Sequence, residues 1–150
     1  MTTEQLRHRM PPILKALKER SLRGRTPVEG LRRTECAYHG WDTVHADAAS
    51  WEPFAPGDAF GGLEAHHCFK GTVTLPEASA GKRVVCLVST GASDIWNNNN
   101  PQFLAYVDGR LVCGLDVNHN EFDLAACAVP GESHELALYV YCNTPARDVF

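Results

Sequence analysis

Hydrophobic and polar positions divide the chain into a helix-forming beginning and a longer strand-forming remainder. In the first part, apolar residues recur at intervals of three and four, which predicts an amphipathic helix. The residues of this apolar stripe are Leu6, Met10, Ile13, Leu14 and Leu17. Pro11 and Pro12 interrupt the pattern. Because proline suits the first turn of a helix better than its interior, we expect the helix to restart there.

From residue 66 onward, short runs rich in β-branched and aromatic residues predict one strand after another. The runs are HHCFKGTVTL (66–75), KRVVCLVST (82–90), QFLAYV (102–107), RLVCGL (110–115), EFDLAAC (121–127) and HELALYVYC (134–142). Asp108 and Gly109 separate two of these runs and supply the positive φ angles of a tight type I′ hairpin. Short strands with Gly/Pro turns between them favour a mostly β fold, an antiparallel β-sandwich or jelly roll.

Charge follows the same division of the chain. The 150 residues are 44% hydrophobic and 21% charged, which suits one domain with a real core. Residues 1–33 hold nine Lys or Arg and three acidic residues, a balance of +6, whereas residues 34–150 hold five and fifteen, a balance of −10. We therefore expect a basic helical arm at 1–33 and a β-sandwich domain at 34–150. The arm is expected to pack on the acidic body, on a neighbouring domain or on a second subunit.

Several classes of partner and site are not expected. The net charge of −4 and an arm without aromatic residues do not suit nucleic acid. No run approaches the roughly 20 apolar residues of a membrane span, and the first residues lack a secretory core, so we expect a cytoplasmic protein. The six cysteines form no CxxC pair. They are interpreted as small buried hydrophobic residues, with a disulfide framework as the minority alternative and a zinc site less expected still.

No arrangement of residues predicts catalysis within this chain. There is no GxSxG, Walker loop or HExxH motif. His66 and His67 are adjacent on a predicted strand and so should point to opposite faces, which argues against a shared metal ion. We therefore expect no catalytic residue, no bound metal and no cofactor in this chain.

Three strings between residues 51 and 124 carry a resemblance to a known family. They are WEPFAPGDAFGG, HHCFKGTVTLPEASAGKRVVCLVSTG and NPQFLAYVDGRLVCGLDVNHNEFDL. Together they resemble the N-terminal domain of bacterial-type α-mannosidases of glycoside hydrolase family 38. The matching positions are Gly57, Asp58, Gly61, Gly62, Phe69, Pro76, Gly81, Lys82, Asn100, Pro101, Gln102, Asp108, Gly109, Gly114, Leu115, Asp116, Asn118, His119 and Glu121. Phe60 and Cys68 depart from the family, which usually has Trp at each position.

The resemblance implies a fold and a parent enzyme. It implies a galactose-binding-domain-like jelly roll that serves as a non-catalytic accessory domain. The family enzyme hydrolyses terminal α-mannosides with retention, using a zinc-bearing catalytic barrel, and that barrel would follow residue 150. The barrel of the same parent chain is then the implied partner, zinc belongs to the barrel, and the α-mannoside is bound only by the full-length protein.

The segment HADAASW (45–51) resembles the zinc motif of that family incompletely. His45 and Asp47 have the spacing of its two ligands, but Trp51 comes one residue late. Two ligands cannot hold a catalytic zinc ion, which needs three protein ligands and an open position. We interpret this segment as a coincidence.

The loop DVNHNE is the first candidate for a binding site. Asp116, Asn118, His119 and Glu121 cluster after a predicted hairpin, and in the parent enzyme they are candidates for the rim of the mannoside pocket. The alternative is a self-contained turn, in which Asp and Asn side chains bond to nearby backbone.

A stand-alone carbohydrate-binding module is the alternative function. Trp96 in the polar stretch DIWNNNNP is the best sugar-stacking candidate, ahead of Trp41, Trp51, Tyr38 and Phe60. Since a buried or barrel-facing position is the default for each Trp, we expect no sugar binding by the isolated chain. Oxygen ligands near Asp94 and Asn97–Asn100 would suit calcium, but too few acids alternate there, and we expect none bound. Apolar surface meant for the barrel makes a homo-oligomer possible.

Overall fold

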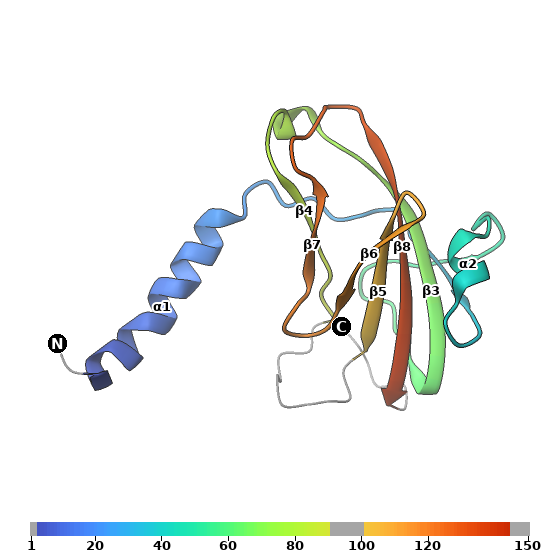
Figure 1. The fold of residues 1–150 in the computed structure, drawn as a ribbon, viewed down its shortest axis with the longest axis horizontal. Coiled ribbons are helices and arrows are strands. Elements are labelled where there is room, and N and C mark those ends of the chain that lie inside the picture. The colour runs from blue at the N-terminus through green and yellow to red at the C-terminus, as the bar shows by residue number, and fades with distance from the viewer. Residues whose placement is uncertain (1–2, 91–100, 145–150) are drawn as a thin grey trace.

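The structure is a computed structural model that describes residues 3–90 and 101–144, with the side chains of 7–17, 21–90 and 101–143. One long helix precedes a body of strands (Figure 1). The elements are α1 (Thr3–Ser21), β1 (Arg32–Glu35), α2 (Trp41–His45), β2 (Glu52–Pro53), β3 (Gly62–Thr74), the 3-10 turn η1 (Glu77–Ser79), β4 (Val84–Leu87), β5 (Gln102–Val107), β6 (Arg110–Leu115), β7 (Glu121–Ala125) and β8 (Ser133–Thr144).

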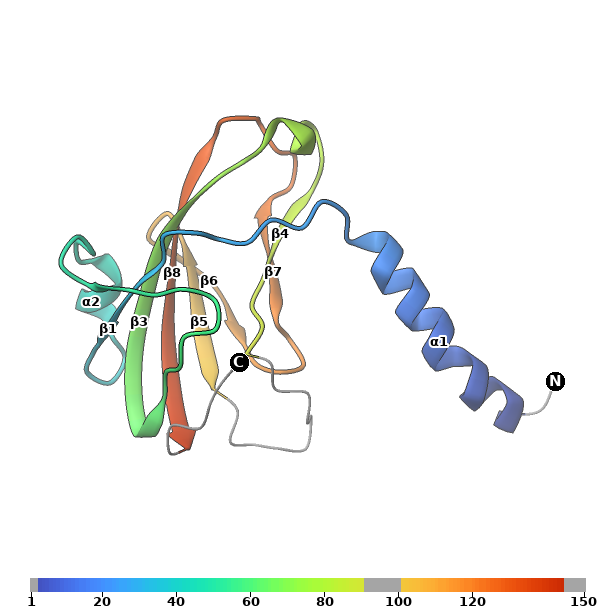
Figure 2. The ribbon, with the colours of Figure 1, turned by 180° about the vertical axis from the view of Figure 1, so that it is seen from behind.

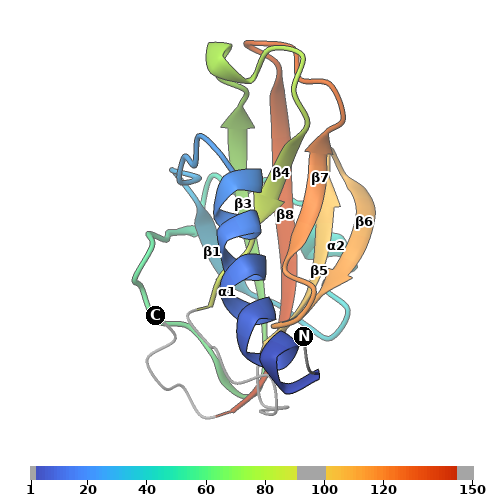
Figure 3. The ribbon, with the colours of Figure 1, turned by 90° about the vertical axis from the view of Figure 1, so that its left-hand side faces the viewer.

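The strands form two antiparallel sheets. A six-stranded sheet has the order β2-β1-β3-β8-β5-β6, and β4 pairs with β7 in a second sheet. Figure 3 shows β4 and β7 lying across one face of the larger sheet. The prediction of a mostly β chain with antiparallel sheets is confirmed, whereas the jelly-roll, galactose-binding-like type stays a prediction.

A hydrophobic core fills the space between the two sheets. Alternate residues of β8 and β5 point into it, because successive side chains of a strand face opposite sides. Its buried members are Phe69, Leu75, Phe103, Ala105, Leu115, Phe122, Leu124, Ala128, Leu136, Val140 and Cys142. Phe122 and Leu124 come from β7 in the smaller sheet, so this core holds the two layers together.

A second, smaller core covers the opposite face of the large sheet. There, α2 and the segment around it lie against β3 and β8, on the side away from β4 and β7 (Figures 1 and 2). The buried members are Val44, Trp51, Cys68, Tyr106, Ala137 and Tyr139. Lys70 fastens this layer, because its buried ammonium group donates to the Ala46 carbonyl oxygen at 2.8 Å and lies 3.2 Å from the Glu135 carboxylate.

The predicted type I′ hairpin between β5 and β6 is confirmed. Asp108 and Gly109 have φ angles of 51° and 74°, and Val107 pairs with Arg110 across the turn. The Asp108 carboxylate also accepts the backbone N–H of Glu135 at 2.9 Å. The hairpin is thereby tied to the start of β8.

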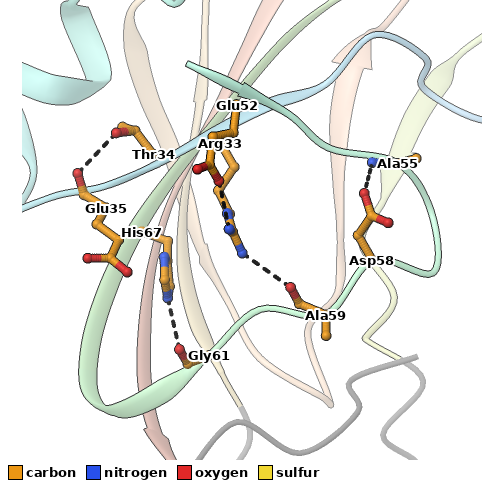
Figure 4. A network of polar contacts seen from close by, with 9 residues as sticks. All are labelled: Arg33, Thr34, Glu35, Glu52, Ala55, Asp58, Ala59, Gly61 and His67. Atoms are coloured by element: carbon orange, nitrogen blue, oxygen red, sulfur yellow. Dashed lines mark hydrogen bonds and ion pairs between the residues drawn. The ribbon is translucent and has the colours of Figure 1, made fainter. Parts of the chain in front are cut away.

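The loop that leads into β3 is held by polar contacts, drawn in Figure 4. Arg33 of β1 pairs with the Glu52 carboxylate at 3.0 Å and donates to the Ala59 carbonyl oxygen at 3.2 Å. Asp58 accepts the backbone N–H of Ala55 at 2.7 Å. Residues of the GDAFGG string therefore help to hold this loop in place.

The same loop closes one end of the main core. The rings of Phe54 and Phe60 lie 4.8 and 4.9 Å from that of Phe69, each in an edge-to-face arrangement. The buried His67 ring lies on this side of β3, with Nε2 3.3 Å from the Gly61 carbonyl oxygen. Phe60 is thus occupied in core packing.

The helical arm differs from its prediction in two respects. First, α1 is one helix that includes Pro11 and Pro12, so the expected restart is wrong. On an exposed helix, water can bond the carbonyl groups that the prolines leave without an N–H donor.

Second, the arm extends away from the sandwich (Figures 1 and 2). Its apolar stripe is exposed, with Met10, Ile13, Leu14 and Leu17 at 48%, 53%, 51% and 59% of their accessible surface. No described side chain of α1 belongs to either core. The arm therefore does not pack against the protein's own body, which was one of the three partners expected for it.

The cysteines follow their prediction in part. All six lie within the described residues as free thiols, and Cys68 and Cys142 are buried. Cys127 is exposed, so its interpretation as a buried residue is wrong: it follows the end of β7, outside both cores. In the part of the chain that the structure describes, no helix has the length and apolar character needed to span a membrane.

Candidate functional site

An open groove of about 700 Å³ lies on the outer face of the large sheet, beside the segment that leads into α2. Strands β3, β5, β6 and β8 and the turn after β6 all contribute to it. Its lining residues are Tyr38, His39, Glu64, His66, Gln102, Phe103, Leu104, Gly114, Leu115, Asp116, His119, Tyr139 and Tyr141. This volume falls within the range of ligand sites in proteins.

Aromatic side chains from two neighbouring strands form the floor of the groove. Tyr139 and Tyr141 lie two residues apart on β8 and therefore face the same side, and His66 of β3 pairs with Tyr141 in register. The Tyr139 hydroxyl accepts the backbone N–H of His39 at 3.2 Å and lies 2.7 Å from His66 Nδ1. Burial raises the pKa of Tyr139. These contacts fix the floor before any ligand arrives.

A β-bulge places an acidic side chain at one end of the groove. The pairing of β3 with β8 shifts between Gly62 and Ala65, and Glu64 within this bulge has a φ angle of 55°. Such left-handed backbone is uncommon for a residue with a side chain, and bulges often redirect a side chain. The Glu64 carboxylate accepts the Tyr141 hydroxyl at 3.1 Å. Desolvation, followed by the neighbouring carboxylate, raises the pKa of Tyr141.

The turn after β6 forms another part of the rim. Asp116 Oδ1 accepts the backbone N–H groups of Asn118 and His119 at 2.7 and 2.8 Å. The bonds from His119 and then Asn118 lower the pKa of the Asp116 carboxyl group. The His119 side chain is 81% exposed. The turn is therefore closed on itself while it presents two side chains to the groove.

The predicted rim loop thus divides into two pairs. Asp116 and His119 line the groove, whereas Asn118 and Glu121 do not. Glu121 begins β7 and pairs with Leu87 of β4 in the smaller sheet. The self-contained turn, one of the two alternatives in the sequence, is present in the structure. A place for these residues at the rim of a mannoside pocket stays a prediction.

The two tryptophans that the structure describes, Trp41 and Trp51, do not line the groove. Trp41 is 51% exposed on α2, with its ring 6.4 Å from that of Tyr106 in an edge arrangement, and Trp51 is buried in the outer core. Trp96 lies outside the described residues, as do Asp94 and Asn97–Asn100. Of the other aromatic candidates, Tyr38 lines the groove.

The HADAASW segment brings no metal ligands together. The His45 ring lies 6.3 Å from that of Tyr106, and Asp47 accepts the backbone N–H of Ala49 at 3.0 Å. His66 faces Tyr139 and Tyr141, whereas its neighbour His67 contacts phenylalanines on the other side of β3, as predicted. Within residues 3–90 and 101–144, no group of three or more His, Cys, Asp or Glu side chains is arranged to hold a metal ion.

Sequence reasoning missed most of the groove. Glu64, His66, Gln102, Tyr139 and Tyr141 come from strands far apart in the chain, and none was a candidate site residue. The one available signal was the pair Tyr139 and Tyr141, two aromatic residues at strand spacing that share a face.

Comparison with known proteins gives a likeness of fold. No family model and no curated protein matches the chain. Among solved structures, it is similar to a Ruminococcus gnavus β-glucuronidase, with a TM-score of 0.52 and 8% identity, covering 77% of this chain and 20% of that one. A Faecalibacterium prausnitzii β-glucuronidase gives a TM-score of 0.48 and 18% identity over 81% of this chain and 22% of that one.

At such low identity the likeness concerns the fold alone. The chain spans about 20% of the length of the Ruminococcus gnavus enzyme. Its antiparallel, mostly β body is therefore similar in fold to one part of a larger glycoside hydrolase.

Proposed function

We propose that this chain is a non-catalytic accessory domain of a larger glycoside hydrolase, and that the parent enzyme is a retaining, zinc-dependent α-mannosidase. The observation that carries the proposal is that the hairpin resembling the α-mannosidase family supplies one side of the groove. Five of the matching positions line it, namely Gln102, Gly114, Leu115, Asp116 and His119. The resemblance and the candidate site thus overlap at these five positions.

The likeness of fold supports the coarser part of this proposal. The Ruminococcus gnavus protein is by name a β-glucuronidase, and only about 20% of its chain corresponds to this one. A fold used as one part of a larger glycosidase suits an accessory role. The choice of an α-mannoside as substrate rests on the three strings between residues 51 and 124.

In the parent enzyme, the domain would pack on the zinc-bearing barrel and bring the rim of the groove toward its pocket. Asp116 and His119 are the side chains proposed for that rim. The exposed apolar stripe of α1 offers a further contact, either with the barrel or with a second copy of the chain.

The test is to express the reading frame extended beyond the codon for Phe150 and to assay it with 4-nitrophenyl α-mannoside and 4-nitrophenyl β-glucuronide. We expect hydrolysis of the mannoside alone, loss of turnover after zinc is removed by a chelator, and no turnover by residues 1–150. Hydrolysis of the glucuronide in place of the mannoside would refute the proposed parent. Turnover by residues 1–150 would refute the accessory role.

The rim proposal is tested in the same enzyme by two neighbouring substitutions. His119→Ala should raise KM for the mannoside, because this side chain lines the groove. Asn118→Ala is the matched control and should leave KM unchanged, because Asn118 lies in the same turn but outside the groove. An equal rise in KM in both variants would indicate that the effect comes from a disturbed turn and not from the loss of the His119 side chain.

A further inference from the structure

We infer that the groove is itself a binding site for a neutral pyranose, one that disfavours sugars bearing a carboxylate. This inference rests on the proposed carbohydrate-related role, and it is independent of which glycoside the parent cleaves. It also departs from the sequence-based expectation of no sugar binding by the isolated chain. That expectation rested on the default burial of the tryptophans, whereas the groove is lined by Tyr38, Tyr139 and Tyr141.

The aromatic side chains present surfaces suited to the face of a sugar ring. Tyr38 is 70% exposed at the edge of the groove, and its ring meets that of His66 edge-on at 5.6 Å. The Tyr141 ring lies 5.2 Å from the same imidazole. Pyranose rings carry C–H groups on their faces, and aromatic side chains offer rigid apolar contact to such surfaces.

Polar groups also line the groove beside this aromatic floor. Glu64 and Asp116 supply carboxylate acceptors, and Gln102 and His119 supply side chains with both donor and acceptor atoms. Each sugar hydroxyl both donates and accepts, so a mixed set of this kind suits it. A purely apolar ligand would displace water from these groups and offer them no hydrogen bond in return.

The charge of the lining selects against uronic acids. It contains two carboxylates, and among the described residues that line the groove none is Lys or Arg. A uronate would bring a third carboxylate beside two others, with no guanidinium or ammonium group to pair with. Repulsion of this kind is an effective source of specificity.

A cationic amine is the competing ligand class, since aromatic rings and carboxylates also attract cations. The rings of this groove come from one face of a sheet and one loop edge, and they form a floor rather than an enclosing cage. The Asp116 carboxylate is engaged by two backbone N–H groups, and that of Glu64 by the Tyr141 hydroxyl. These features favour hydroxyl groups over an ammonium group.

The test is a chemical-shift titration of the ¹⁵N-labelled chain with methyl α-D-mannopyranoside, methyl β-D-glucopyranoside, D-glucuronate and choline, each to about 50 mM, since single sugars on open sites bind at millimolar Kd. We expect shifts confined to the groove with at least one neutral glycoside. Glucuronate should bind roughly fivefold more weakly or not at all. The absence of shifts with every neutral glycoside, or tighter binding of choline, would overturn the inference.

Three variants sharpen the result. Tyr38→Ala should weaken sugar binding by up to about tenfold, and because Tyr38 is largely exposed, the fold should survive. Trp41→Ala is the matched control, an exposed aromatic residue outside the groove, and it should bind as the wild type does. Glu64→Gln should reduce the difference in binding affinity between glucuronate and the neutral sugar. Equal losses in the Tyr38 and Trp41 variants, or an unchanged difference in the Glu64 variant, would contradict the inference.

The inference and the proposed function fail separately. A chain whose groove binds no sugar, within a parent enzyme that cleaves α-mannosides, would refute only the binding site. Sugar binding by the groove, within a parent that cleaves another glycoside, would refute only the α-mannosidase.

Discussion

Gly40 directly precedes α2 and lies against Tyr139 and Cys68. Its φ angle is 53°, and a Cβ atom there would stand 2.6 Å from Tyr139 Cδ2 and 3.2 Å from Cys68 Sγ. Gly40→Ala should therefore combine backbone strain with a collision against buried atoms and lower the free energy of unfolding by about 2–4 kcal/mol. Urea denaturation measures this change.

Gly81 provides the matched control for that substitution. Its φ angle is 66°, but no atom lies within 4 Å of the position of an added Cβ. Gly81→Ala should cost only the strain of the left-handed backbone, about 1–2 kcal/mol. Equal losses in the two variants would show that the approach of Gly40 to Tyr139 is unimportant.

Asp108 makes the hairpin sensitive to acid. The hydrogen bond from His134, followed by that from the Glu135 backbone N–H, holds the pKa of Asp108 below its ordinary value. The folded state thus favours the charged carboxylate. The resulting stability is complete above the unfolded pKa of about 3.9 and is lost as the pH falls through the lower pKa of the folded state.

Asp108→Asn tests this dependence, since Asn tolerates the left-handed turn but carries no charge. We expect the variant to melt at a lower temperature than the wild type at pH 7, with the two melting temperatures converging below pH 4. Thermal unfolding followed by circular dichroism across pH 2.5–7 measures it. A difference in melting temperature between variant and wild type that stays constant with pH would exclude the proposed role of the carboxylate.

At the scale of elements, local patterns predicted some strands better than others. The bounds of β5 and β6 match the runs QFLAYV and RLVCGL, because the Asp108–Gly109 turn fixes both ends of the hairpin. The segment that holds β1, α2 and β2 was not predicted. Its residues alternate poorly, and its burial depends on covering a sheet formed by later strands.

The distance between residues along the chain also explains which parts of the candidate site could be identified from the sequence. The loop from Asp116 onward was identified because its polar residues are neighbours in the sequence. The floor of the groove was not identified, because it depends on the register of His66 in β3 against Tyr141 in β8. Most of the domain separates these two strands in the sequence. A shift of one residue would send these side chains into the main core instead.

The arm and the sandwich should be separable at a definite residue. Removing residues 1–24 takes away α1, none of whose described side chains enters a core, so the melting temperature should stay within about 2 °C of the full chain. Removing residues 1–31 also takes Val28, which packs on the main core, and Leu31, whose carbonyl oxygen accepts the Phe54 N–H at 2.8 Å. This second truncation should lower the melting temperature clearly. An equal fall in both would show that α1 stabilises the body.

Over the whole molecule, the cysteines offer a measure of native packing. Burial raises the pKa values of Cys86 and Cys142 to about 11 each, and that of Cys68 further. At pH 8, a thiol with such a pKa is a thiolate in only about one molecule in a thousand, and the thiolate is the reactive form. Cys127 is exposed.

Brief alkylation with iodoacetamide at pH 8, followed by mass spectrometry of the peptides, should label Cys127 first. The other thiols should react at the same rate only after unfolding in guanidinium chloride. Cys127→Ser should abolish the fast phase. Rapid labelling of Cys68 or Cys142 in the native protein would contradict the two-core packing.

The projecting arm also gives the molecule an electrical polarity. Its 19 helical residues extend for about 28 Å, whereas a compact chain of 150 residues has a radius of gyration of about 15 Å. The far end of α1 thus lies nearly three Debye lengths from the anionic body at 0.1 M salt, so the body does little to neutralise the basic residues there, whereas Arg33 is paired with Glu52 within the body. The protein should be retained by both cation- and anion-exchange resins at neutral pH and low salt. In dilute buffer, each molecule carries a permanent dipole that favours head-to-tail encounters.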